Sequence, residues 1–193
     1  WEALMAILPE GILPVTLGGA QPERMGNRDT QMAPHGVYPA AGDDRWVSIA
    51  VRDDSEWSRL APLLAAAAAD ARFATQAARK ANEDALEELV SGWTRSRDEW
   101  AISEELQALG IAAAPVFDMK DLAEAPHLEE REFFVRLPHA AVGVQTHAGI
   151  PWKLHGTPLA IEESAPLMGE DNEYVIRELL GRSQEEYERL LAE

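Results

Sequence analysis

The clearest local pattern in the sequence is Gly36-Val37-Tyr38-Pro39-Ala40-Ala41-Gly42-Asp43-Asp44-Arg45-Trp46-Val47-Ser48-Ile49-Ala50-Val51. Two runs rich in β-branched and aromatic residues, 36–41 and 46–51, predict two β-strands. The segment between them, 42–44, is typical of a tight turn, because glycine and aspartate tolerate the backbone angles that a turn requires. The stretch therefore predicts an antiparallel β-hairpin.

Two helices are predicted directly after the hairpin. Asp53 or Asp54 is expected to cap the first, which the alanine run 65–69 extends, and Asn82 is expected to cap the second. In both segments apolar residues recur at helical spacing and so predict the buried face. These residues are Trp57, Leu60 and Leu64 in the first helix and Leu86, Leu89, Val90 and Trp93 in the second.

A third helix begins with the pattern of a capping box, since Ser96 and Glu99 can satisfy each other's backbone donors. Gly110 is expected to end it, because glycine readily adopts the left-handed conformation that follows many helices. A strand is predicted over 111–117, whereas 133–137 is expected only to be extended and 142–147 shows only weak alternation. Together these elements predict an α+β fold, a small antiparallel sheet with packed helices.

The two ends of the chain have different patterns. Residues 2–8 carry apolar groups at helical spacing that Pro9 is expected to stop, and 21–34 predict a loop. Near the other end, a helix over 170–180 and a capping box at 183–186 are predicted. The inward face of the first of these helices is expected to consist of Val175, Ile176, Leu179 and Leu180.

The composition excludes several classes of partner and site. The 193 residues include 17 lysines and arginines against 34 aspartates and glutamates, a net charge of −17. Such a surface repels phosphate backbones and anionic lipid, so neither a nucleic acid nor a membrane is expected as a partner. The absence of cysteine excludes disulfides and thiolate chemistry, and it is compatible with the cytoplasm, the location that we predict.

Motifs that carry chemistry are few. The five histidines do not form a His-x-x-x-His pair, so loop histidines are favoured over metal ligands and no metal site is predicted. The carboxylates suit turns, caps and solvated helix faces, so no catalytic residue is predicted in this chain. The segment 24–38 stands out because it concentrates basic, amide and imidazole groups in a loop. An ordered linker is the alternative interpretation of that loop.

A set of short segments occurs in a fixed order along the chain: 26–27, 34–39, 42–51, 110–116, 126–128 with Arg131 and 133–135, 156–158 and 165–170. In this order they resemble the second half of family III CoA-transferases. This CaiB/BaiF group includes formyl-CoA transferase, carnitine CoA-transferase and α-methylacyl-CoA racemase. One position departs from the family's pattern, since Ala112 stands where a proline is usual.

The resemblance implies a domain organisation. Residues 1–33 would be a linker from a large Rossmann-like domain that is absent here, 34–150 the small domain, and 151–193 a segment that returns to the large domain. Two chains would interlock as a homodimer. The enzymes of the family use coenzyme A as a substrate and need no cofactor.

The resemblance also implies a reaction. Family III transferases move CoA between an acyl-CoA and a carboxylic acid through an aspartate that forms first a mixed anhydride and then a CoA thioester. That aspartate and most basic groups for CoA would lie in the absent half. The chain is therefore predicted to be part of an acyl-CoA:carboxylate CoA-transferase (a reaction of the EC 2.8.3 type) and to be inactive by itself.

Within this chain, the resemblance makes Asn27, Gln31 and His35 candidates to line the acyl side of the substrate cleft. The segment 27–32 takes the place of the glycine-rich lid of formyl-CoA transferase but has no glycine run, which favours a bulkier acyl group. Two alternatives remain open. One is an acyl-CoA racemase of the same superfamily, which moves a proton beside the thioester carbonyl. The other is a non-catalytic module for binding or dimerisation.

Overall fold

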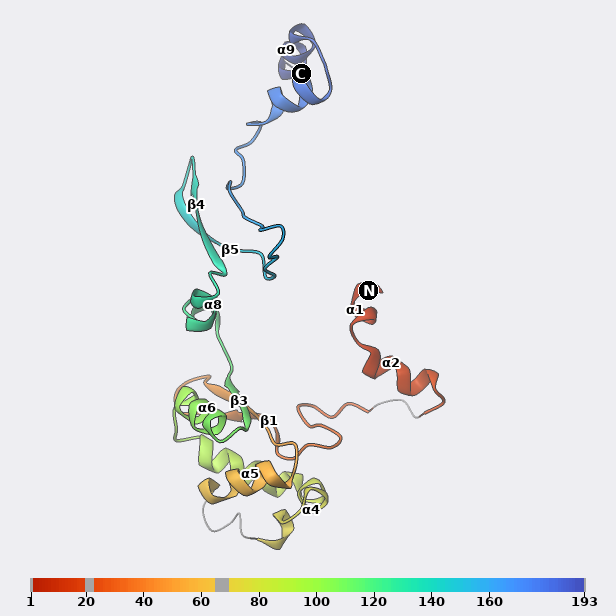
Figure 1. The fold of residues 1–193 in the computed structure, drawn as a ribbon, viewed down its shortest axis with the longest axis vertical. Helices are drawn as coiled ribbons and strands as arrows, with labels where there is room; N and C mark the ends of the chain where they lie inside the picture. Colours follow the sequence, from red (N-terminus) through yellow and green to blue (C-terminus); the bar gives the residue numbers. More distant parts are fainter. Residues whose placement is uncertain (1, 20–22, 65–69, 193) are drawn as a thin grey trace. The chain divides into compact units, whose positions relative to one another are not determined.

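The computed structural model describes residues 2–19, 23–64 and 70–192, and the chain divides into two compact units, Trp1–Val116 and Phe117–Glu193 (Figure 1). The described elements of the first unit are α1 (Glu2–Ala6), α2 (Pro9–Thr16), β1 (His35–Pro39), β2 (Trp46–Ala50), α3 (Asp54–Leu60), the 3-10 turns η1 (Ala61–Leu64) and η3 (Ala71–Phe73), α4 (Gln76–Ala81), α5 (Glu83–Thr94), α6 (Glu99–Ala108) and β3 (Ala112–Pro115). Those of the second unit are α7 (Met119–Ala123), α8 (Pro126–Glu130), β4 (Phe134–His139), β5 (Gly143–Ala148), the π-helical turn η4 (Tyr174–Leu179) and α9 (Gln184–Ala192).

The sheet of the first unit has the strand order β1-β2-β3, and both pairs are antiparallel. The predicted hairpin is confirmed, with His35 opposite Ala50 and Pro39 opposite Trp46. Its turn places Gly42 at φ 116° and Asp44 at φ 51°, backbone angles that glycine and aspartate accept more readily than most residues. The third predicted strand is present but shorter, so the α+β class with a small antiparallel sheet is confirmed.

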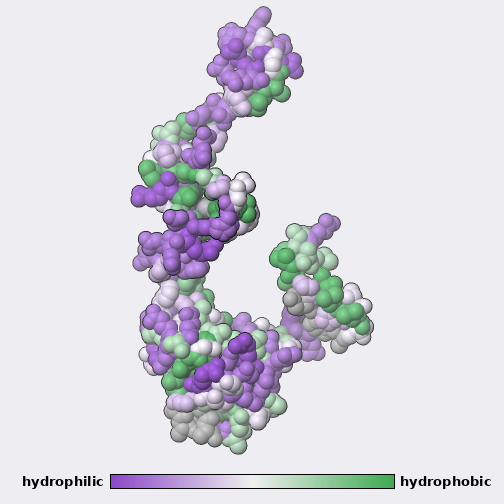
Figure 2. Space-filling model, in the orientation of Figure 1, coloured by the Kyte–Doolittle hydropathy of each residue, from purple (hydrophilic) through white to green (hydrophobic). Residues whose placement is uncertain are grey.

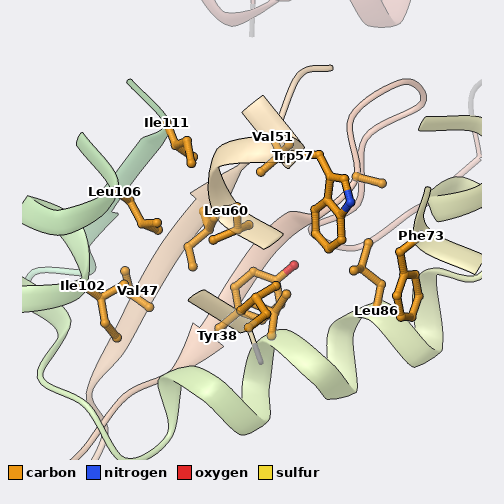
Figure 3. Close-up of a cluster of buried hydrophobic side chains, with 14 residues drawn as sticks. Tyr38, Val47, Val51, Trp57, Leu60, Phe73, Leu86, Ile102, Leu106 and Ile111 are labelled. Carbon is orange, nitrogen blue, oxygen red and sulfur yellow. The ribbon is translucent and has the colours of Figure 1, made fainter. Parts of the chain in front are cut away.

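One face of this sheet packs on helices α3, α5 and α6 to form the core (Figure 3). Trp57 and Phe73 meet edge to face, with ring centroids 6.2 Å apart. The helical faces predicted from spacing are confirmed, while the alanine run 65–69 lies outside the described residues. The buried apolar residues of the core are Ala33, Tyr38, Val47, Ile49, Val51, Trp57, Leu60, Leu64, Phe73, Leu86, Val90, Ile102, Leu106 and Ile111, with Leu89 and Trp93 partly buried against them.

Two of the predicted helix caps are wrong, although Asp53 caps α3 as expected. The side chain of Asn82 makes no cap for α5, because its amide donates back to the carbonyl of Ala78 at 2.8 Å. Helix α6 is capped by Asp98, whose Oδ1 accepts from the next backbone N–H groups, rather than by Ser96. Glu99 cannot complete a capping box with Ser96 because its carboxylate binds Arg45.

Helix ends elsewhere in the first unit follow the chemistry of glycine and proline. Gly110 ends α6 with φ 71°, as predicted. Pro9 begins α2 instead of only stopping the preceding helix, because the first helical position needs no N–H donor. Apolar side chains of α1 and α2 stand exposed (Figure 2), among them Met5 of α1 at 56% and Leu13 of α2 at 51%.

The second unit has little core of its own. Strands β4 and β5 pair as an antiparallel hairpin that was not predicted, and Ser183 and Glu186 form the predicted capping box with two hydrogen bonds of 3.1 Å. Helix α8 was not expected; Pro126 occupies its first turn. The prediction of an inward face in segment 170–180 is wrong for three of its four residues, because no apolar layer of this unit covers them. Val175 is 41% exposed, and Leu179 and Leu180 are both 63% exposed. In the described part of the chain, no helix is long and apolar enough to cross a membrane.

Candidate functional site

The face of the three-stranded sheet that does not join the core forms the floor of a cleft. Strand side chains alternate between faces, so the residues between the buried Tyr38, Val47 and Ile49 point away from the core. The antiparallel register aligns them in two rows across the sheet. The rows are His35, Ala50 and Ala112, and Val37, Ser48 and Ala114.

The cleft over this floor has a volume of about 670 Å³. It is bounded by the loop segment 26–28 and by Gln107 of α6, whose side-chain amide donates to the carbonyl of Ala113 at 2.8 Å. Volumes of about 300–1,000 Å³ are typical of small-molecule sites. Five of the six floor positions carry small or medium aliphatic or hydroxyl side chains. These short side chains leave the surface of the sheet accessible to a ligand.

Arg28 fixes the cleft-lining loop to helix α5. Its guanidinium forms a two-point pair with Glu87, at 2.7 and 2.9 Å, and a third contact of 2.5 Å with Asp84. These hydrogen bonds raise the pKa of Arg28 above its ordinary value, chiefly through Glu87 and then through Asp84. The cation is therefore already compensated by two carboxylates from the protein itself.

Helix α4 holds the backbone of the same loop through three of its side chains. Gln76 donates to the carbonyl of Gln31 at 2.5 Å, and Lys80 donates to that of Asp29 at 2.5 Å. The buried Arg79 donates to the carbonyl of Ala33 at 2.8 Å. Because these contacts are spread along the loop, residues 29–33 are fixed on the body of the unit rather than left as a free connection.

A hydrogen bond closes the loop beside the cleft. Nδ1 of His35 lies 2.6 Å from the carbonyl oxygen of Asn27. A carbonyl oxygen only accepts, so Nδ1 carries the proton, and Nε2 is the acceptor in the neutral ring. This bond joins the two ends of the segment 27–35 and holds Asn27 and His35 together at the cleft.

The structure brings two of the three predicted site residues together. Asn27 and His35 line the cleft, whereas Gln31 does not. Its backbone carbonyl accepts from Gln76 of α4, and its side chain is exposed. Sequence reasoning missed Ser48 and Gln107. Ser48 could have been found from the alternation of β2, but Gln107 had no local signal because it reaches the sheet from a neighbouring helix.

The chemistry that this cleft offers is binding rather than nucleophilic attack. None of its described lining residues is an aspartate, glutamate or cysteine. The Ser48 hydroxyl already donates its proton to the carbonyl of Ala114 at 3.0 Å. Within residues 2–19, 23–64 and 70–192, no group of three histidines, cysteines, aspartates or glutamates is placed to hold a metal ion.

Comparison with known sequences finds one family. A family model described as CoA-transferase family III matches residues 1–172. A probable CoA-transferase of Mycobacterium tuberculosis, Rv1866, is 38% identical over 162 residues, which are 82% of this chain and 20% of that protein. Succinyl-CoA–D-citramalate CoA-transferase of Chloroflexus aurantiacus is 26% identical over 194 residues, 100% of this chain and 48% of that protein.

Comparison with solved structures finds proteins of similar fold. A CAIB/BAIF family protein from Brucella suis matches with a TM-score of 0.78 and 25% identity, covering 90% of this chain and 45% of that one. Rv3272 from M. tuberculosis matches with a TM-score of 0.68 at 17% identity, which shows a shared fold. The chain thus spans about half, or less, of the length of the relatives and structures that it matches.

Proposed function

The chain belongs to CoA-transferase family III, and from this membership we propose that it is part of an enzyme that transfers coenzyme A from an acyl-CoA to a carboxylic acid. The observation that carries the proposal is the family match over residues 1–172. The activities named for similar proteins support it, since they include succinyl-CoA, formyl-CoA and succinate–glutarate CoA-transferases. Coenzyme A then enters as a substrate.

The proposed reaction proceeds through an aspartate in the part of the relatives that this chain does not span. Its carboxylate attacks the thioester carbonyl of the donor, the C–S bond breaks, and CoA leaves as the thiolate. The thiolate attacks the aspartyl carbonyl of the mixed anhydride, which yields an aspartyl-CoA thioester and frees the donor acid. The acceptor carboxylate then attacks that thioester, and the same steps in reverse release the new acyl-CoA and the aspartate.

In this proposal the present chain supplies the surface that receives the acyl group. Asn27 and His35 contact the acyl side of the substrate from the cleft, and Gln31 acts through the loop that holds them. Acyl groups bulkier than formyl are expected, since no glycine run is present at 27–32. Residues 1–33 act as a linker, 34–150 as the small domain and 151–193 as the segment that returns to the large domain of an interlocked, cytoplasmic homodimer.

A two-part assay tests the function. The full-length protein from the natural gene is incubated with acyl-CoA donors and unlabelled acids, and the new acyl-CoA is measured by mass spectrometry; residues 1–193 are assayed alone beside it. Transfer by the full-length protein and none by the chain alone is the expected result. Epimerisation of a 2-methylacyl-CoA without transfer would instead identify a racemase, and neither activity would identify a binding or dimerisation module.

The role of the cleft residues has its own test in the full-length enzyme. Replacement of His35 or Asn27 by alanine is expected to raise the KM for the acid by about tenfold, because a direct contact with the substrate is lost. The matched control is His155→Ala, which removes an exposed imidazole that does not line the cleft. Equal KM values for all three variants would contradict the assignment.

A further inference from the structure

We propose that the acyl tail received by this cleft is uncharged, so that the enzyme prefers monocarboxylic over dicarboxylic acids. This inference rests on the proposed function and adds the substrate class. It is carried by the charge balance of the cleft, which follows from the partners of Arg28. The names of several relatives include dicarboxylic acids, so the inference separates this chain from them.

The first step is the inventory of cations at the cleft. Among its described lining residues, the only lysine or arginine is Arg28. The remaining polar side chains are Asn27, Ser48 and Gln107, with the imidazole of His35. Neutral donors and acceptors of this kind suit hydroxyl, carbonyl and aliphatic parts of a ligand, whereas recognition of a second carboxylate usually uses an uncompensated cation.

The second step is that Arg28 is not such a cation. Glu87 binds Nε and Nη2 at 2.7 and 2.9 Å, and Asp84 binds Nη2 at 2.5 Å. One positive charge and two negative charges leave this group of three with a net charge of −1. An incoming carboxylate would therefore meet repulsion at the one point where a cation lines the cleft.

The third step is the shape of the floor. Each of the two rows across the sheet has a small residue on β2 and another on β3. These are Ala50 and Ala112 in one row, and Ser48 and Ala114 in the other. Their small side chains leave room for an aliphatic chain to lie flat on the sheet. Arg28 is thus a positioning residue, since it holds the loop that carries Asn27 instead of binding the substrate.

The test compares two four-carbon acids of nearly equal size in the full-length enzyme. Isotope exchange is measured between butyryl-CoA and labelled butyrate, and between succinyl-CoA and labelled succinate. We expect exchange with butyrate to exceed that with succinate by about tenfold or more, the order expected for bringing a like charge into a partly desolvated site. A preference for succinate would overturn this inference alone, whereas no exchange with either acid would overturn the proposed function and the inference together.

Variants that remove the negative charges paired with Arg28 test whether this pairing causes the preference for monocarboxylic acids. The double variant Asp84→Asn/Glu87→Gln keeps oxygen acceptors for the guanidinium but removes both negative charges, so the succinate-to-butyrate ratio is expected to rise by about tenfold. Glu88→Gln is the matched control, an exposed glutamate on the same helix that does not line the cleft, and its ratio should equal that of the wild type. A folded double variant with an unchanged ratio would overturn the proposal.

A second variant keeps the proposal falsifiable if the double variant does not fold. Ala114→Lys adds an unpaired cation to an exposed position on the floor of the cleft. It should raise exchange with succinate relative to butyrate, and the gain should shrink at high salt because ions screen an exposed charge. An unchanged ratio would show that the acyl tail does not reach this face of the sheet.

Discussion

Tyr38 is only 2% exposed, so water does not reach its hydroxyl freely. This hydroxyl has no hydrogen-bond partner among the described residues. Burial raises the pKa of this hydroxyl, so it stays protonated at neutral pH. Tyr38→Phe should leave the free energy of unfolding unchanged or raise it by up to about 1 kcal/mol, because an unpaired buried polar group is removed. Urea unfolding checks this, and a loss above about 1 kcal/mol would reveal a partner.

Asp29 gives the fold a dependence on pH. Its carboxylate accepts from the backbone N–H of Met32 at 2.9 Å and of Gln31 at 2.7 Å, and these bonds lower its pKa. A depressed folded pKa means that the stabilisation is complete above the ordinary value of about 3.9 and is lost as the pH falls through the folded pKa. Asp29→Ala should therefore cost about 1 kcal/mol at pH 7 and less at pH 3.

The matched control for this prediction is Asp29→Asn, which keeps an oxygen acceptor but cannot ionise. Its free energy of unfolding should lie between those of the wild type and the alanine variant at pH 7. A cost of the alanine variant that is the same at pH 7 and pH 3 would show that ionised Asp29 does not stabilise the loop. Urea unfolding at the two pH values is the measurement.

At the scale of elements, helix α6 shows which of two candidate caps is used. Asp98→Ala should lower the free energy of unfolding by about 1 kcal/mol, because two backbone donors lose their acceptor. Ser96→Ala is the matched control and should change it by less than about 0.5 kcal/mol. A larger loss of unfolding free energy in Ser96→Ala than in Asp98→Ala would instead support the capping box predicted from the sequence.

Elements were predictable wherever a local pattern determines them. The hairpin of β1 and β2, the buried faces of α3 and α5, and the end of α6 at Gly110 all follow from alternation, helical spacing or glycine chemistry. Caps were less predictable, because a side chain chooses among several partners. Glu99 accepts a hydrogen bond from Arg45, which lies 54 residues earlier in the chain, and no local pattern predicts that contact.

At the scale of the whole molecule, the two units differ in how much apolar surface they bury. In the described chain, only Ala125 and Leu137 of the second unit are buried apolar residues, whereas the first unit holds the main core. Amides of β4 and β5 should therefore exchange with deuterium at least about tenfold faster than those of β1 and β2, since local opening is easier where few contacts are lost. Hydrogen exchange with mass spectrometry checks this, and equal protection would contradict it.

The same experiment on the full-length protein addresses the proposed domain organisation. If 151–193 returns to a large domain, the amides of α9 should be more protected there than in residues 1–193 alone. Unchanged exchange of α9 would contradict that placement. The exposure of Leu179 and Leu180 here is the feature that such a docking would remove.

Local patterns predicted the hairpin and the loop that borders the cleft, because each rests on residues near one another in the chain. The family and the α+β class followed from several such short patterns in order along the chain. The sequence also pointed to Asn27 and His35. Three findings needed the three-dimensional fold: that the outer face of the sheet is the cleft floor, that Gln31 lies outside it, and that Arg28 is paired with two carboxylates. The partners of Arg28 are 56 and 59 residues away, and contacts at that separation are set by packing of helices on the sheet rather than by any local pattern.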